Sequence, residues 1–137
     1  MELADTSVWT NRRKDPAVSR DFETRLLAGK IAMCAMVELE LLWEAQDAPR
    51  FRARRERFEA LKRVSMGDRV WRRATDVFER LAEAGSLHHR SVAIPDLLIA
   101  AAAEIAEIPL CHYDRDFDVI ATITGQPMRA IAPLGSL

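Results

Sequence analysis

The chain has 137 residues, of which 49% are apolar and 30% are charged, with a formal net charge of −1. This length suits one domain, residues 1–137, and the composition is that of an ordinary globular chain, which excludes disordered and fibrous classes. There is no run of about 18 apolar residues and no secretory signal, so no membrane span is expected. Two cysteines are too few for a disulfide framework, and we expect a reducing, cytoplasmic location.

The chain begins with a short apolar stretch at residues 2–4 that ends at Asp5 and two hydroxyl residues. This pattern predicts a buried strand, a polar turn and a helix starting near Ser7. The elements expected after it are, in order, a helix at 16–27, a strand at 31–37, helices at 38–44, 51–64, 68–84 and 95–105, a strand at 110–113, a short helix ending near 125 and a strand at 128–131. Short strands alternating with helices predict an α/β fold with a parallel sheet covered on both faces.

Acidic residues follow the predicted strands at four separate places. Asp5 follows the first strand, and Glu40 lies near the start of the helix after the second strand. Asp96 lies in the first turn of the alanine-rich helix, and Asp114 and Asp116 follow the strand at 110–113. Because such junctions share one edge of a parallel sheet, these side chains are expected to gather there.

Each acid also has a purely structural interpretation. Asp5, like the acids after the strand at 110–113, can cap a helix, and Asp96 in a first turn is favourable to the helix dipole. Glu38 competes with Glu40, although Glu40 interrupts an apolar run. Capping alone explains four acidic junctions less well, because serine, threonine and asparagine cap as effectively.

Carboxylates that converge repel one another and raise each other's pKa unless a cation neutralises them. Hard oxygen donors select Mg²⁺ or Mn²⁺, and such an ion can polarise a phosphodiester and lower the pKa of a bound water. Zinc is the competing metal, but Cys111-His112 and His88-His89 lack the spaced ligand pairs of a zinc site. The acids therefore predict a magnesium or manganese centre that acts on phosphate esters.

Four segments carry a resemblance to a known family. They are residues 3–9 (Leu-Ala-Asp-Thr-Ser-Val-Trp), 37–43 (Val-Glu-Leu-Glu-Leu-Leu-Trp), 94–101 (Ile-Pro-Asp-Leu-Leu-Ile-Ala-Ala) and 112–118 (His-Tyr-Asp-Arg-Asp-Phe-Asp). In this order and at these spacings they resemble the motifs of PIN-domain ribonucleases, most closely the VapC toxins of type II toxin–antitoxin pairs. The resemblance covers essentially the whole chain.

The resemblance implies a parallel sheet of order 3-2-1-4-5 and Mg²⁺- or Mn²⁺-dependent cleavage of structured RNA, of the tRNA or rRNA class. It also implies inhibition by a VapB-like antitoxin, and homodimers. Asp5, Glu40, Asp96 and Asp116 match the catalytic acidic quartet of the family, with Asp114 as a frequent additional ligand. The metal ligands implied are the four aspartates.

An acidic site repels RNA, so another surface must attract it. Arginines crowd into residues 50–63. On a helix, Phe51 and Phe58 would face the core and leave Arg54, Arg55 and Arg57 largely free for solvent or phosphate. These three arginines are the candidate RNA-binding residues, and the alternative is an ordinary solvated face with Arg–Glu pairs.

Other classes fit the sequence less well. A haloacid-dehalogenase-type phosphotransferase would need an aspartate two residues after Asp5, where Ser7 stands, and a receiver domain would need a lysine after Lys62. A catalytically inactive PIN-like module that binds RNA or protein would be expected to have lost acids. We therefore rank endoribonuclease first and the inactive module second.

Overall fold

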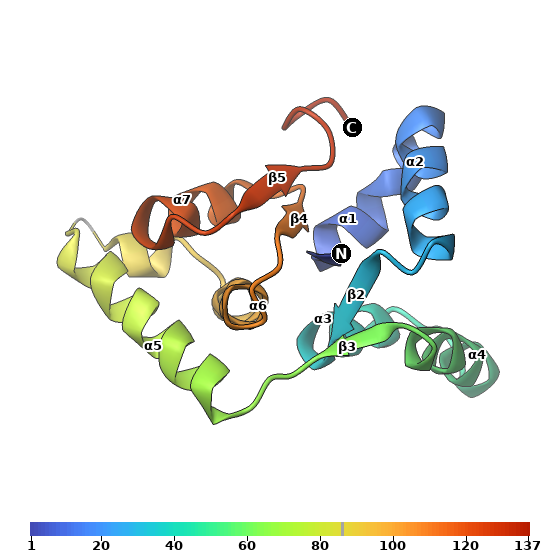
Figure 1. Ribbon diagram of the computed structural model, residues 1–137, viewed down its shortest axis with the longest axis horizontal. Coiled ribbons are helices and arrows are strands. Elements are labelled where there is room, and N and C mark those ends of the chain that lie inside the picture. The colour runs from blue at the N-terminus through green and yellow to red at the C-terminus, as the bar shows by residue number, and fades with distance from the viewer. Residues whose placement is uncertain (86) are drawn as a thin grey trace.

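A five-stranded parallel sheet forms the centre of the computed structural model, which describes residues 1–85 and 87–137. The strands are β1 (Glu2–Ala4), β2 (Ile31–Cys34), β3 (Lys62–Val64), β4 (Leu110–His112) and β5 (Met128–Ala130). Each pairs in parallel with its neighbours in the order β3-β2-β1-β4-β5. This confirms the predicted α/β class and the strand order that the resemblance implied (Figure 1).

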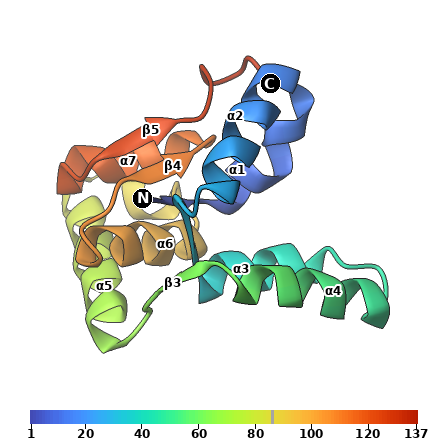
Figure 2. The same ribbon diagram turned by 45° about the vertical axis from the view of Figure 1, so that its right-hand side comes forward.

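Seven helices surround the sheet within the described residues. They are α1 (Thr6–Asn11), α2 (Pro16–Leu27), α3 (Ala35–Trp43), α4 (Ala48–Glu59), α5 (Asp68–Glu83), α6 (Ile94–Ile105) and α7 (Arg115–Thr124). A proline in the first turn starts α2, α4 and α6, because its fixed φ suits that position. In Figure 2, α3 and α4 extend away from the rest of the molecule, and α1 and α2 lie on the other side of the gap between these helix pairs.

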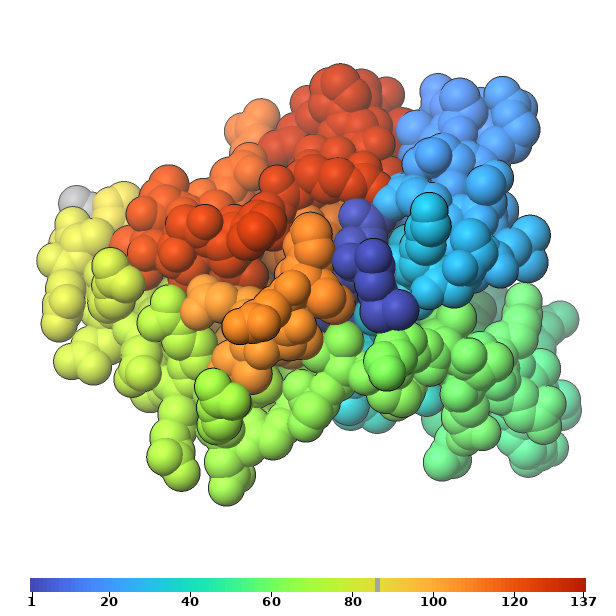
Figure 3. Space-filling view, in the orientation of Figure 1, coloured from blue at the N-terminus to red at the C-terminus, as the bar shows by residue number. Residues whose placement is uncertain are grey.

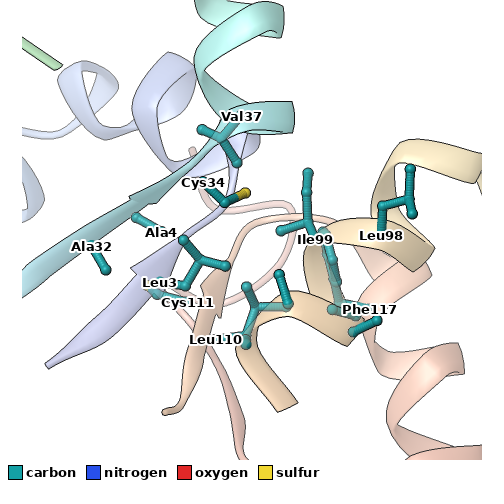
Figure 4. Close-up of a cluster of buried hydrophobic side chains, with 14 of the residues drawn as sticks. Leu3, Ala4, Ala32, Cys34, Val37, Leu98, Ile99, Leu110, Cys111 and Phe117 are labelled. Carbon is teal, nitrogen blue, oxygen red and sulfur yellow. The ribbon is translucent and has the colours of Figure 1, made fainter. Parts of the chain in front are cut away.

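The core lies between the central strands and α6. Leu3 and Leu110 from the sheet meet Ile99 of α6 and Phe117 of α7, and all four are fully buried (Figure 4). Four consecutive alanines of α6, at 100–103, are also buried, and their small side chains let this helix approach its neighbours closely. The core thus fixes the positions at which α6 and α7 begin, beside the carboxyl ends of the strands.

The largest differences in bounds concern the elements expected at 31–44 and 51–64. The strand expected at 31–37 stops three residues early, because α3 already begins at Ala35. The helix expected over 51–64 ends at residue 59, and β3 (Lys62–Val64) follows it as an edge strand. The sequence pattern does not predict this strand, because its Lys-Arg-Val triplet is too short and too charged to show the alternation of a strand.

Across the described residues, no helix combines the length and the apolar character needed to cross a bilayer. Cys34 and Cys111 are both buried and form no disulfide.

Candidate metal centre at the carboxyl edge of the sheet

Three of the five predicted acids occupy strand-to-helix junctions of the sheet, whereas Asp96 and Glu40 do not, because no strand directly precedes α6 and Glu40 lies beyond the first turn of α3. Asp5 follows β1 and caps α1, and Asp114 follows β4 and caps α7. Asp96 and Asp116 lie in the first turns of α6 and α7, and Glu40 lies within α3. Carboxylate oxygens of Asp96, Asp114 and Asp116 lie within 4.8 Å of one another. The charge of Asp5 raises the pKa of Asp96 in this cluster, and the charge of Glu40 in turn raises the pKa of Asp5.

Asp5 has one engaged and one free carboxylate oxygen. Its Oδ2 accepts hydrogen bonds from the backbone N–H of Ser7 at 2.8 Å and from Ser7 Oγ at 2.5 Å. Its Oδ1 is buried and has no partner among the described residues. Ser7 Oγ in turn accepts from the backbone N–H of Tyr113 at 2.9 Å, which ties the end of β1 to the end of β4. A single hydroxyl therefore orients Asp5 and joins two junctions of the site.

The two glutamates of α3 have separate surroundings. Glu40 Oε1 accepts a hydrogen bond from Thr6 Oγ1 at 2.8 Å, which places Glu40 next to the Asp5 junction. Glu38 is buried and forms an ion pair with Arg63 of β3. Since Glu38 is already neutralised by Arg63, Glu40 is the member of the pair that belongs to the acidic site.

Burial and mutual repulsion make the ionised forms of the carboxylates at this site less favourable. The pKa of Asp96 rises to about 8, first because the side chain is buried and then because the carboxylates of Asp5, Asp114 and Asp116 lie near it. Burial also raises the pKa of Asp5, although its hydrogen bonds to Ser7 act in the opposite direction. Such shifts are expected where acids are gathered without a neutralising cation.

Backbone contacts fix the acids contributed by α7. Asp114 Oδ1 accepts from the N–H of Asp116 at 2.9 Å, and Asp116 Oδ2 accepts from the N–H of Ala93 at 3.2 Å. His112 Nδ1 accepts from the N–H of Asp114 at 3.2 Å, and burial lowers the pKa of this imidazole. His112 is thus a neutral acceptor that supports the turn.

Sequence reasoning did not assign roles to Thr6 and Ser7, the two hydroxyl residues after Asp5. Both were treated only as part of a helix start, and their partners are 34 and 106 residues away along the chain. The local signal was present, because a serine two residues after an aspartate is a common turn partner for its carboxylate.

The structure differs from the prediction for one of the three candidate RNA-binding arginines. Arg54 is not largely free, because its Nη1 donates to the carbonyl of Leu41 at 2.6 Å and so joins α4 to α3. Arg55 is exposed and pairs with Glu59 at 3.3 Å, as the solvated-face interpretation expects. Arg57 is exposed and lines a groove between the helix pairs.

Comparisons with known proteins agree on one family. A family model described as PIN domain matches residues 3–123. Ribonuclease VapC18 of Mycobacterium tuberculosis is 41% identical over 133 residues, which cover 97% of this chain and 96% of that protein. Ribonuclease VapC51 of the same organism is 38% identical over 135 residues, or 98% and 96% of the two chains.

Solved structures show the same fold. DNA-bound VapBC from Salmonella typhimurium matches with a TM-score of 0.73 at 18% identity, covering 96% of this chain and 100% of that chain. VapBC-1 from nontypeable Haemophilus influenzae matches with a TM-score of 0.72 at 17% identity, covering 95% and 97%.

Proposed function

Because this chain belongs to the PIN domain family, as a VapC-type member of it, we propose that it is an endoribonuclease toxin of a VapBC-type pair. The reaction is hydrolysis of a phosphodiester in structured RNA, of the tRNA or rRNA class, with Mg²⁺ or Mn²⁺. The observation that supports it most is the set of carboxylates at one sheet edge, with a buried oxygen of Asp5 left without a partner.

The donor set suits a hard divalent cation. All five acids offer oxygen, and three of them bring carboxylate oxygens within 4.8 Å of one another, a spacing that one or two ions can bridge. The buried Asp5 Oδ1 also lacks the hydrogen bond that an uncoordinated oxygen would need. Asp5, Asp96, Asp114 and Asp116 would hold the metal. His112 is a poor ligand, because its Nδ1 already accepts a backbone hydrogen bond.

A divalent ion bound here supplies Lewis-acid polarisation of the scissile phosphate and lowers the pKa of a water molecule. The protein's own side chains orient the reactants. Thr6 holds Glu40 through Oε1, which leaves Oε2 to accept a hydrogen bond from the attacking water. Ser7 holds Asp5 through Oδ2, which leaves Oδ1 for the cation. The water oxygen attacks phosphorus while its proton passes to Glu40, the P–O bond to the ribose oxygen of the leaving RNA strand breaks, and that oxygen takes up a proton from solvent.

For RNA attraction we retain Arg55 and Arg57, the two exposed members of the arginine set, and regard Arg54 as partly structural. Each neutralised phosphate steepens the loss of affinity with salt by roughly 0.7 to 0.9 log units per log unit of salt. Changing both to glutamine should therefore weaken RNA binding and flatten this slope. The matched control is glutamine at the exposed Arg20 and Arg80 of other helices. If the salt dependence of RNA affinity is the same in the two double variants, the arginine face of α4 is an ordinary solvated face that does not bind RNA.

The antitoxin is proposed to occupy the groove between the helix pairs α1–α2 and α3–α4, whose arrangement Figure 2 shows. This groove has a volume of about 540 Å³, and Leu41, Phe58 and Arg57 are among its lining residues. Trp9 Nε1 and Arg12 Nε, which belong to two further lining residues, are buried donors without a partner in the described chain. Because these two atoms are closed to a partner, we expect recognition through apolar contact with Leu41 and Phe58 and a charge pair with Arg57.

An arginine or lysine of the same antitoxin would reach the acidic centre and replace the metal charge there. Crosslinking of the complex tests this mode of inhibition directly. A contact surface remote from both Asp5 and Asp96 would exclude direct blockade.

The functional proposal is tested by expressing the chain without an antitoxin and mapping new RNA ends in the cell. Wild type and Asp76→Ala, which alters an exposed acid of α5, should generate the same new ends, whereas Asp5→Ala should generate none. If no new ends arise while the purified protein binds Mn²⁺, the chain is a non-catalytic binding module instead.

A further inference from the structure

Two exposed residues begin the helices that carry most of the acidic centre. Ile94 is the first residue of α6 and comes two residues before Asp96. Arg115 is the first residue of α7 and stands between two further acids of the centre. The centre lies at the other end of the strands from the face shown in Figure 3, where the dark blue amino terminus lies beside the orange residues that precede β4.

A hydrogen bond holds these two helix starts against each other. The N–H of Ala93, the residue before Ile94, donates to Asp116 Oδ2 at 3.2 Å. Carboxylate oxygens from the first turns of α6 and α7 also lie within 4.8 Å of one another, together with one of Asp114. The backbone positions of Ile94 and Arg115 therefore flank the same group of carboxylates, one from each helix.

Neither residue is explained by the folding of its helix. Arg115 is a cation in the first turn of α7, where the helix dipole favours anions, and none of the ion pairs in the described part of the chain includes it. Ile94 is 61% exposed, although a β-branched side chain gains little in a helix unless it packs. Two such departures from local preference beside one centre are expected where function requires them.

An RNA strand at this centre needs a cation close to the acids. The carboxylates repel every phosphate except the one that a metal ion neutralises, so the neighbouring phosphates need another partner. Among the described residues in the first turns of α1, α3, α6 and α7, Arg115 alone is basic. A guanidinium binds two phosphate oxygens at once, and an aliphatic side chain can pack against the face of a base.

We propose that Ile94 and Arg115 form a clamp for the nucleotide next to the scissile phosphate, an inference that rests on the proposed function. Arg115 pairs with the phosphate of this nucleotide, and Ile94 packs against its base. Because Ile94 offers no hydrogen bond, the clamp requires an open base face without selecting which base presents it.

Binding to uncleaved RNA tests the clamp separately from the reaction. The Asp5→Asn background keeps the RNA intact, so fluorescence anisotropy in Mg²⁺ can measure the affinity for a short labelled single strand and for a blunt duplex. Arg115→Gln should weaken binding of the single strand by about threefold, as expected for one exposed ion pair. It should also lower the salt dependence of this affinity by roughly 0.7 log units per log unit of salt, the share of one phosphate.

Ile94→Ala should act only where a base face is open. We expect it to weaken binding of the single strand by about threefold and to leave binding of the duplex unchanged. The matched controls are Arg20→Gln and Leu27→Ala, which alter exposed residues of α2 and should leave both affinities unchanged. All four positions are exposed, so these variants should fold.

Two further readouts separate the clamp from a structural role. In the wild-type background, Arg115→Gln and Ile94→Ala should raise KM more than they lower kcat, because groups that bind without reacting act on affinity. Mn²⁺ affinity should be unchanged in both variants. A loss of Mn²⁺ affinity would overturn the proposal, since the residue would then act through the carboxylates.

The clamp is also overturned if Arg115→Gln binds RNA like Arg20→Gln, or if Ile94→Ala weakens binding of the single strand no more than Leu27→Ala. If wild type cleaves RNA and the variants bind like their controls, the clamp alone fails. If wild type does not cleave RNA but the differences in binding persist, the proposed reaction fails and the clamp stands as an RNA-binding surface.

Discussion

At the scale of single residues, an acid that caps a helix can still have a carboxylate oxygen free for a metal ion. Asp5 and Asp114 both cap helices, and Asp5 does so with one oxygen while the other remains free. The sequence indicated the acids because carboxylates recurred at four junctions. It did not indicate Thr6 and Ser7, because their hydroxyls act through contacts made only in the folded chain.

Asp96 should make the metal-free protein less stable as the pH rises. Its folded-state pKa is raised from 3.8 to about 8, so within this range the folded protein keeps a proton that the unfolded chain has lost. The proton on Asp96 therefore stabilises the folded state most near pH 4. This stabilisation decreases by on the order of 2 kcal/mol as the pH rises to about 8. Asp96→Asn should remove this dependence.

Urea unfolding at pH 6 and pH 8 in the presence of a chelator measures the effect. Asp76→Asn is the control, because Asp76 is an exposed acid on α5. The same loss of stability between the two pH values in wild type and Asp96→Asn would contradict the assignment.

Ser7 should act as a positioning residue for Asp5. Ser7→Ala removes the donor to Asp5 Oδ2 and the acceptor of the Tyr113 N–H, so we expect a loss of about 1–2 kcal/mol in stability. RNA cleavage should fall by about tenfold or more, and Mn²⁺ affinity should fall with it. Thr10→Ala on the same helix removes an exposed hydroxyl and should change neither quantity. Unchanged Mn²⁺ affinity in a folded Ser7→Ala protein would argue against this role.

At the scale of secondary-structure elements, the sequence pattern predicts some helices and strands and fails to predict others. The helix predicted at 16–27 has these bounds in the structure, because Asp15 and Pro16 start it and Gly29, with φ of +70°, follows its end. The edge strand β3 was not predictable, because three residues give no alternation and its two basic side chains are exposed. Its position depends on pairing with β2, which is a tertiary contact.

The ion pair between Glu38 and Arg63 should hold β3 against α3. Glu38 has a side chain only 12% exposed, whereas that of Arg63 is 44% exposed, so solvent weakens the pair. Arg63→Met leaves Glu38 without its partner and should cost about 1 kcal/mol. The double variant Glu38→Met/Arg63→Met should recover most of this loss in denaturant unfolding. A double variant less stable than Arg63→Met alone would show that the pair is not what anchors the strand.

At the scale of the whole molecule, the sheet brings together acids that lie up to 111 positions apart in the sequence, from Asp5 to Asp116. The sequence predicted this gathering, but parallel topology accounts only for the acids that follow strands, whereas Asp96 is brought in by α6, which no strand directly precedes.

The exposed apolar side chains should mark the homodimer interface that the family resemblance implied. Trp43 and Leu39 of α3 are 86% and 62% exposed, and Trp71 of α5 is 55% exposed, an unusual number of large apolar groups in water. Trp43→Glu should therefore shift the protein to monomers in sedimentation velocity. Leu27→Glu is the control, because Leu27 is 87% exposed on α2. An unchanged dimer in Trp43→Glu, or a monomeric wild type, would exclude this interface.

The central claim is that the acidic edge of the sheet is a metal-dependent centre for RNA hydrolysis. It is tested most directly by incubating the purified chain and its Asp5→Asn variant with structured RNA, with Mg²⁺ or with a chelator. We expect cleavage by wild type and by the control Asp76→Asn only when Mg²⁺ is present, and none by Asp5→Asn, whose fold should survive because one repelling charge is removed. Full cleavage by folded Asp5→Asn, or by wild type in the chelator, would contradict the account.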